Sequence, residues 1–169
     1  MKKIVRNYLE IKSIKELILP KNSKKNLKIK LLLQPDFQLN KFFYKQIGKN
    51  YYWIDRLIWT DQDWIKYVSK KNVFTYVLYE NNNIAGFFEL IYHEEKKETE
   101  LAYLGLLHEF IGKKLGAHLL SEAIKTSWNF KINRVWLHTC SLDHPNALKN
   151  YLGRGMKIFH HETIFRNIA

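Results

Sequence analysis

The chain has 169 residues, of which 46% are hydrophobic and 15% aromatic. A chain of this size can bury the core of one domain and hardly of two, so we expect a single domain over residues 1–169. The formal net charge of +12 comes mostly from lysines scattered along the chain. Scattered lysines are typical of a solvated surface and do not by themselves indicate nucleic-acid binding.

Cysteine content and hydropathy limit the cellular compartment. Cys140 is the only cysteine, which excludes an internal disulfide and a cysteine-rich metal site. Charged residues interrupt the apolar segment that a secretory leader would need, and no apolar run approaches the roughly 20 residues of a membrane helix. We therefore expect a cytoplasmic protein without a membrane-spanning segment and without a metal site.

The first part of the chain predicts two strands followed by two helices. Short apolar stretches predict strands over residues 4–11 and 27–33, with a turn at 20–23 between them. Pro35 and Asp36 then begin a helical stretch. Thr60 is placed to cap a second helix with an acidic first turn. The aromatic segment between these two helices is either helix or loop.

The middle of the chain predicts an antiparallel meander. Residues 73–79 and 84–92 are apolar and flank Glu80-Asn81-Asn82-Asn83, which indicates a hairpin turn. A charged turn precedes the third strand, over residues 100–106.

The last part of the chain predicts a crossover. A helix from about Gly112 to Trp128 is followed by a strand over Arg134–Cys140, and a strand, a helix and a strand of this length imply a parallel pair with a right-handed connection. Pro145 begins a shorter helix that ends at Gly153–Gly155, and one or two strands over residues 156–165 end the chain.

The junction between the third strand and the long helix has the features of an anion site. The strand stops near Leu106, and the chain turns through Gly112 and basic residues into the helix. A helix start presents unpaired N–H groups and a partial positive charge, which suits an oligophosphate. Gly116 allows close approach to the backbone. We expect Lys114 to adopt right-handed helical geometry without strain and to add a contact to an acidic ligand.

Two motifs in this region resemble those of the GNAT acyltransferase superfamily. The first is the acyl-CoA-binding loop, a strand, Pro and two further residues followed by Arg/Gln-x-x-Gly-x-Gly/Ala, from which His108, Ile111 and Lys114 depart. The second is Asn-x-x-Ala-x-x-x-Tyr-x-x-x-Gly-Phe, with His144 in the place of the asparagine and with Ala147, Tyr151, Gly155 and Met156 following. The order of predicted elements also matches over residues 27–165, while residues 1–26 form an extension with no counterpart.

The resemblance implies a fold and a cosubstrate. The fold is mixed α+β, with a central, mostly antiparallel sheet, a splayed parallel strand pair and flanking helices. Acetyl-CoA would enter the gap between the splayed strands, where freed backbone groups need partners. The residues implied in cofactor binding are Leu104, Gly105 and Leu106 on the strand, Gly112, Lys113, Lys114, Leu115, Gly116 and Ala117 in the loop, and His144.

The reaction that the resemblance implies is direct attack of an amine on the acetyl thioester, with no enzyme nucleophile. Tyr151 matches the acid that protonates the leaving sulfur, although a tyrosine on the apolar face of a helix is also a common packing residue. Glu100 lies at the spacing of a base that acts through water, and a solvent-exposed glutamate is an equal alternative. Glu89 is the competing base because it interrupts an apolar strand. His138 is a weaker candidate for a catalytic residue.

The acceptor is less well defined by the sequence. Trp53, Asp55 and Trp59 lie where the resemblance places the acceptor cleft, with Glu89 as a further carboxylate, and they suit a cationic small-molecule or peptide amine. The aromatic residues are equally consistent with packing. Two other functions stay open: an acyl-CoA-binding sensor without catalysis and, less favoured, a basic nucleic-acid-binding protein. A homodimer is also open.

Overall fold

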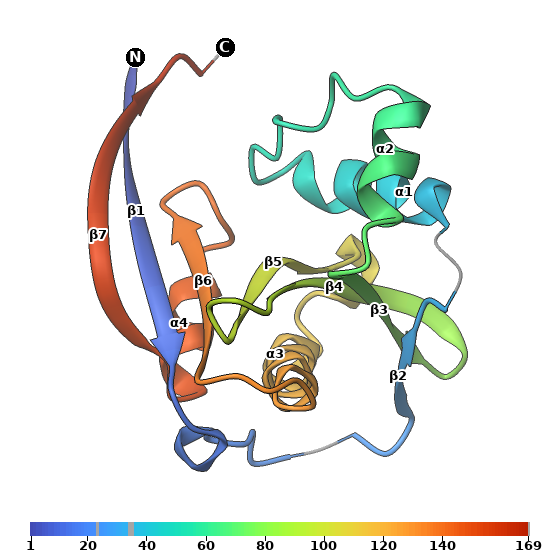
Figure 1. Cartoon of the computed structure of the whole chain (residues 1–169), viewed down its shortest axis with the longest axis vertical. Helices are drawn as coiled ribbons and strands as arrows, with labels where there is room; N and C mark the ends of the chain where they lie inside the picture. The colour runs from blue at the N-terminus through green and yellow to red at the C-terminus, as the bar shows by residue number, and fades with distance from the viewer. Residues whose placement is uncertain (23, 34–35, 169) are drawn as a thin grey trace.

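The computed structural model describes residues 1–22, 24–33 and 36–168. These residues form a seven-stranded sheet in the order β2-β3-β4-β5-β6-β1-β7 with four α-helices beside it (Figure 1). The strands are β1 (Lys2–Ile11), β2 (Leu27–Leu31), β3 (Val73–Glu80), β4 (Asn83–His93), β5 (Glu98–Leu106), β6 (Arg134–Cys140) and β7 (Lys157–Arg166). The helices are α1 (Phe37–Gly48), α2 (Asp61–Val68), α3 (Leu115–Ser127) and α4 (Ala147–Gly153), with short 3-10 turns at Ile14–Glu16 and His108–Phe110.

The mixed α+β class and the mostly antiparallel sheet are confirmed. Every strand pair among the described residues is antiparallel except β5–β6. The hairpin between β3 and β4 turns at Asn81 and Asn82, whose φ angles are 49° and 67°. Two successive positive φ angles match the right-handed twist of the strands, and asparagine accepts them at low cost. Parts of two predictions, Ser23 of the turn and Pro35 of the helix start, lie outside the described residues.

Side-chain caps determine where the first two helices begin. The Asp36 carboxylate accepts hydrogen bonds from the N–H groups of Gln38 and Leu39 at 3.1 and 3.2 Å. Thr60 and Asp63 form a reciprocal capping box at the start of α2. Between these helices the aromatic segment forms turns rather than helix.

The prediction that α3 begins at Gly112 with Lys114 in right-handed geometry is wrong. The helix begins at Leu115, because Gly112 and Lys114 have φ angles of +86° and +62°. The left-handed conformation of Lys114 ends the turn and starts the helix. Likewise, the helix predicted at Pro145 begins two residues later, at Ala147.

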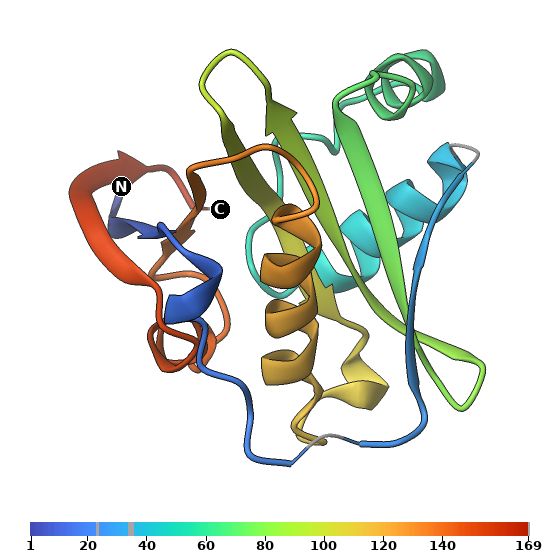
Figure 2. The same ribbon diagram turned by 60° about the horizontal axis from the view of Figure 1, so that its bottom comes forward.

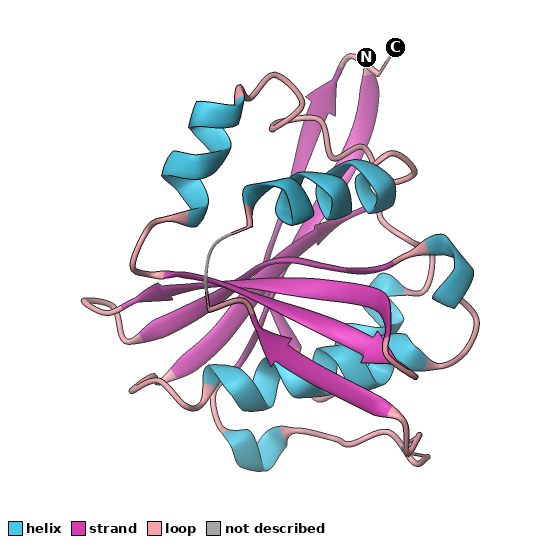
Figure 3. Cartoon of the chain, turned by 90° about the vertical axis from the view of Figure 1, so that its right-hand side faces the viewer, coloured by secondary structure: helices cyan, strands magenta, loops and turns pink. Residues whose placement is uncertain are grey.

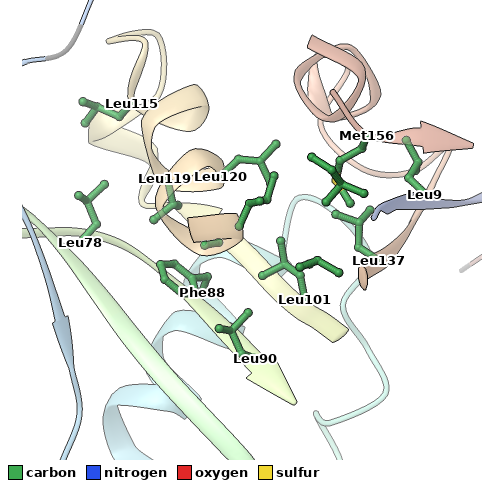
Figure 4. Close-up of a cluster of buried hydrophobic side chains, with 14 of the residues drawn as sticks. Leu9, Leu78, Phe88, Leu90, Leu101, Leu115, Leu119, Leu120, Leu137 and Met156 are labelled. Atoms are coloured by element: carbon green, nitrogen blue, oxygen red, sulfur yellow. The ribbon is translucent and has the colours of Figure 1, made fainter. Parts of the chain in front are cut away.

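The helices cover both faces of the sheet. Helices α3 and α4 lie on one face, while α1 and α2 lie on the other (Figure 3). The main core forms beneath α3, where buried side chains of the helix meet those of the central strands (Figure 4). This core contains Leu9, Leu78, Phe88, Leu90, Leu101, Leu115, Leu119, Leu120, Leu137 and Met156. A smaller cluster around Phe43 and Phe87, whose rings stack at 4.7 Å, holds α1 on the opposite face.

The N-terminal strand is an inner strand of the sheet. β1 pairs with β6 from Arg6↔Cys140 to Ile11↔Val135, and its other edge pairs with β7. Leu9 and Ile11 are fully buried beside α3. The segment that the sequence marks as an extension therefore contributes to the sheet and to the core. No helix within the described ranges is long and apolar enough to cross a membrane.

Replacement of Lys114 by glycine should stabilise the fold. A side chain with φ near +60° costs roughly 1–2 kcal/mol, which glycine avoids, although glycine loses more backbone entropy on folding. We expect the free energy of unfolding to rise by about 0.5–1 kcal/mol in urea titrations. Lys113→Gly is the matched control, because Lys113 has negative φ, and it should not stabilise the protein. A destabilised Lys114→Gly variant would contradict this reading of the loop.

Candidate active site

The site forms where the two parallel strands separate. β5 and β6 pair only from Glu98↔Arg134 to Glu100↔Trp136, although both strands continue beyond that point. β5 follows β4 to Leu106, whereas β6 follows β1 to Cys140 (Figure 1). A cavity of about 1250 Å³ lies along the divergence and is lined by both strands, by the start of α3 and by α4. The splayed parallel pair expected from the sequence is therefore present.

Most of the predicted cofactor residues share this cavity. Its lining includes Leu104, Gly105, Leu106, Gly112, Lys114, Leu115, Gly116, Ala117 and His144. No described side chain caps α3, so its first amide groups are free to bind an anion. Lys113 is not part of the lining, and its ammonium lies 3.6 Å from the Glu80 carboxylate instead.

Close packing explains why β5 carries a glycine at the cavity wall. A Cβ on Gly105 would lie 2.6 Å from the Ile47 Cγ2 atom of α1. α1 thus sits directly on the strand, which brings the segment after α1 to the cavity. Trp53 in that segment packs against Gly48, where a Cβ would lie 2.4 Å from the Trp53 Cβ.

Tyr151 combines a packed ring with a hydroxyl that has no partner among the described residues. Its ring packs at the edge of the main core, and the residue lines the cavity. Within the described ranges the hydroxyl makes no hydrogen bond. Burial, followed by the negative charge of Asp143, raises the pKa of the phenol well above its usual value. The Asp143 carboxylate is held by the Thr139 hydroxyl and the Cys140 N–H. Tyr151 therefore stays protonated at neutral pH.

Glu100 occupies the last position at which β5 and β6 are paired. It lines the cavity, and its side chain is 19% exposed. Its Oε2 atom lies 3.1 Å from Nε2 of His93. The carboxylate thus borders the cavity and has a histidine partner, rather than extending into solvent beside Lys96 and Lys97.

Glu89 is separated from the cavity by a buried ion pair. The residue is 1% exposed and absent from the lining. Its two oxygens accept hydrogen bonds from Arg56 at 3.0 and 2.9 Å, and Oε2 also accepts one from the Tyr67 hydroxyl at 2.9 Å. The Arg56 guanidinium lies over an aromatic cage of Tyr44, Trp59, Trp64, Tyr67 and Tyr103, at 4.1–5.7 Å from the ring centroids. Desolvation lowers the pKa of Arg56, but the negative charge of Glu89 raises it more, so the pKa lies above its usual value.

The predicted acceptor residues divide into two groups. Trp53 and Asp55 line the cavity, whereas Trp59 does not. Trp59 instead packs edge-on against Trp64 and beneath Arg56. Asp55 is 70% exposed and lies 3.8 Å from the Arg166 guanidinium of β7. This contact joins the segment between α1 and α2 to the far edge of the sheet.

Three further polar residues line the cavity near α4. Desolvation, with a smaller effect from the Arg6 charge, lowers the pKa of His138, so this imidazole is neutral at pH 7. Burial raises the pKa of the Cys140 thiol, which disfavours a thiolate nucleophile. His144 accepts a hydrogen bond at Nδ1 from the Asn146 N–H and contacts the Tyr51 ring. No group of three or more side chains in the described residues is arranged to hold a metal ion.

Sequence reasoning missed the cations that line the cavity from distant parts of the chain. These are Arg6 on β1, Lys21 after it, Lys149 and Arg154 at α4, and Arg166 on β7. Arg6 and Arg166 reach the site only because β1 pairs with both β6 and β7. No local pattern marks that pairing.

Comparison with known sequences identifies the family. The profile of the Acetyltransferase (GNAT) family matches residues 32–156, which include the β5–α3 loop and α4. The chain belongs to the GNAT acetyltransferase family. β1 and β7 lie outside the match, so the strands that carry Arg6 and Arg166 are not part of the matched region. No curated protein matches the chain.

Solved GNAT structures share the fold. A GCN5-related N-acetyltransferase from Sphaerobacter thermophilus has a TM-score of 0.69 at 13% identity, over 94% of this chain and 49% of that one. One from Kribbella flavida has a TM-score of 0.66 at 12% identity, over 94% and 56%. The chain thus spans about half the length of these two proteins. A spermidine N-acetyltransferase from Vibrio cholerae in complex with CoA and spermine has a TM-score of 0.64 at 18% identity, over 78% and 81%.

Proposed function

We propose that this GNAT protein transfers an acetyl group from acetyl-CoA to an amine. The observation that carries the proposal is a single cavity, at the splay of β5 and β6, that is lined both by the uncapped start of α3 and by Tyr151. An anionic ligand anchored at α3 would extend along the freed edge of β5 toward Tyr151. Trp53 and Asp55 line the same cavity.

The residues present fit acetyl-CoA. The amide groups at the start of α3 and the Lys114 side chain would hold the pyrophosphate. The backbone groups of Leu104–Leu106 on the side facing β6 have no ladder partner, and they would pair with the amides of the pantetheine arm. When bound, acetyl-CoA supplies an activated acyl group as a thioester.

The side chains at the splay account for the proton transfers. The amine nitrogen bonds to the acyl carbon as the carbon–sulfur bond breaks. Glu100 takes a proton from the ammonium before attack, directly or through water, the nitrogen loses its second proton to solvent as the amide forms, and Tyr151 donates a proton to the departing sulfur. The products are an amide and free CoA, and the two side chains regain their starting states by exchange with solvent. No enzyme nucleophile takes part, consistent with the raised pKa of Cys140.

A cationic amine is the acceptor class that we propose. Trp53, Asp55 and Glu100 present an aromatic surface and carboxylates to the same cavity, which suits an ammonium group before it is deprotonated. The Vibrio cholerae protein was solved with the polyamine spermine, which belongs to this class. A sensor without catalysis needs neither an unpaired phenol nor a carboxylate in the lining of the cavity, and Tyr151 and Glu100 supply both.

Two measurements test this function. Calorimetric titration with CoA and acetyl-CoA should show one site per chain, and a panel of amines should give thiol release that depends on one acceptor class. Binding without thiol release from any amine would indicate the sensor function. Absence of binding would remove both the transferase and the sensor.

The role of Glu100 can be tested through the charge of the acceptor. Glu100→Gln should reduce turnover by about 10²-fold near pH 7, where the amine is protonated and a base is needed. The deficit should shrink as the pH approaches the pKa of the amine, about 10, because the acceptor then arrives neutral. His138→Gln, on the neighbouring strand, is the matched control. If His138→Gln shows this pH-dependent deficit instead, the base is His138.

A further inference from the structure

The cavity has a different charge balance at its two ends. At the end near β1 and β7, Arg6 and Arg166 are paired with Glu162 and Asp55. At the other end, the lining includes Lys21, Lys114, Lys149 and Arg154. None of these four side chains forms an ion pair or a hydrogen bond with any residue that the structure describes. The cavity thus has one end with uncompensated positive charge.

The N-terminal segment brings Lys21 to this end. The Ile18 N–H donates a hydrogen bond to the Arg154 carbonyl at 3.0 Å, and a Cβ on Gly155 would lie 2.2 Å from the Glu16 carbonyl oxygen. Further along, the Lys24 ammonium lies 4.0 Å from Glu80, the same carboxylate that Lys113 approaches. The segment therefore runs from the end of α4 to the loop before α3, as Figure 2 shows along the lower edge of the molecule.

Helix α4 places the other two cations beside α3. The Asn150 side-chain amide donates a hydrogen bond to the Gly116 carbonyl at 3.1 Å, which fixes α4 against the first turn of α3. Lys149 precedes this asparagine, and Arg154 caps the end of the same helix. The Arg154 Nε atom is buried and finds no acceptor among the described residues. An unpaired buried guanidinium nitrogen is costly unless a ligand supplies an acceptor nearby.

We propose that Lys21, Lys149 and Arg154 form a second anion site that binds the 3′-phosphate of CoA. This proposal rests on the proposed function. The α3 start with Lys114 accounts for the pyrophosphate, and it leaves three cations in a cluster beside it. A phosphomonoester carries a charge of about −1.5 to −2 at pH 7 and offers three acceptor oxygens. It is therefore the group of the cosubstrate that matches this cluster.

The discriminating ligand is 3′-dephospho-CoA, which retains the pyrophosphate and the pantetheine arm but lacks the 3′-phosphate. Calorimetry at low ionic strength should show that the protein binds CoA at least about tenfold more tightly than 3′-dephospho-CoA. In the double variant Lys21→Gln/Arg154→Gln this preference for CoA should fall to about twofold. CoA should bind more weakly to the variant, while the affinity for 3′-dephospho-CoA should stay unchanged. The control Lys28→Gln/Lys45→Gln removes two exposed lysine charges outside the cavity lining and should keep the full preference.

Each outcome of this titration has one meaning. Equal affinity of the wild-type protein for the two ligands would overturn the second anion site and leave the proposed function intact. A preference that survives in Lys21→Gln/Arg154→Gln would overturn the assignment to these residues. A protein that binds neither ligand would overturn the proposed function as well.

Discussion

Tyr151→Phe is expected to lower turnover by about one to three orders of magnitude while the affinity for CoA changes by less than about twofold. Tyr151 lines the cavity and its hydroxyl has no protein partner among the described residues, so its removal leaves no broken hydrogen bond in the fold. Its proposed proton transfer stabilises charge on sulfur that develops only during the reaction. The loss should therefore appear in kcat and not in ground-state binding, as measured by steady-state kinetics and calorimetry.

The control for this variant is Tyr76→Phe. Tyr76 is also a half-buried tyrosine at the edge of the main core, and burial also raises its pKa, but it does not line the cavity. Loss of its hydroxyl should leave turnover unchanged. Since the raised pKa keeps the Tyr151 phenol protonated through neutral pH, the ratio of wild-type to Tyr151→Phe turnover should stay constant from about pH 6 to 8. If Tyr151→Phe turns over at the wild-type rate, the residue acts only in packing.

The parts of the fold that depend on local chemistry could be predicted from the sequence. The hairpin at Asn81–Asn82 follows from residues that tolerate positive φ, and the start of α2 follows from the Thr60–Asp63 box. The splay of β5 and β6 was expected only through the family resemblance, because it is a property of two strands whose paired residues are 36 positions apart. The geometry of Lys114 was missed because lysine has no preference for positive φ.

The parts of the site that depend on distant pairing could not be predicted. Glu89 was a candidate base because a carboxylate in an apolar strand needs a partner. The partner is Arg56, 33 residues away in a segment that gives no helical or strand pattern. Likewise, Trp53 and Trp59 are equivalent in the sequence, but in the structure Trp53 packs against Gly48 and lines the cavity, whereas Trp59 lies under Arg56.

Some of the residues that line the cavity lie outside the part of the chain that matches the family. The matched region, residues 32–156, contains the α3 start, Glu100 and Tyr151. Arg6 and Lys21 precede it, and Arg166 follows it. The proposed chemistry is thus carried by the matched region, while the flanking segments add charge to both ends of the cavity. Substrate preference should therefore respond to residues outside the matched region more than the chemical step does.

Breaking the ion pair between Arg56 and Glu89 should cause one of the largest losses of stability expected for a single substitution in this protein. Arg56 is 9% exposed and Glu89 1%, so Arg56→Met leaves a buried carboxylate whose one remaining side-chain partner among the described residues is the Tyr67 hydroxyl. Removal of one member of a buried pair costs about 3–5 kcal/mol, because the remaining charge is uncompensated. We expect a decrease of this size in the free energy of unfolding, measured by urea titration.

The remaining charge, rather than the lost attraction, should cause most of that decrease. Arg56→Met/Glu89→Leu removes both charges and should recover a large part of the stability that Arg56→Met loses, because apolar side chains in place of a buried pair are often nearly neutral. Lys41→Met is the control, since its partner Asp61 is 62% exposed and stays solvated without the lysine, and it should cost less than about 1 kcal/mol. Glu89→Leu should be measured beside the other two variants. If the double variant instead loses as much stability as Arg56→Met and Glu89→Leu together, the aromatic cage around Arg56, and not its charge partner, holds the segment between α1 and α2 against the sheet.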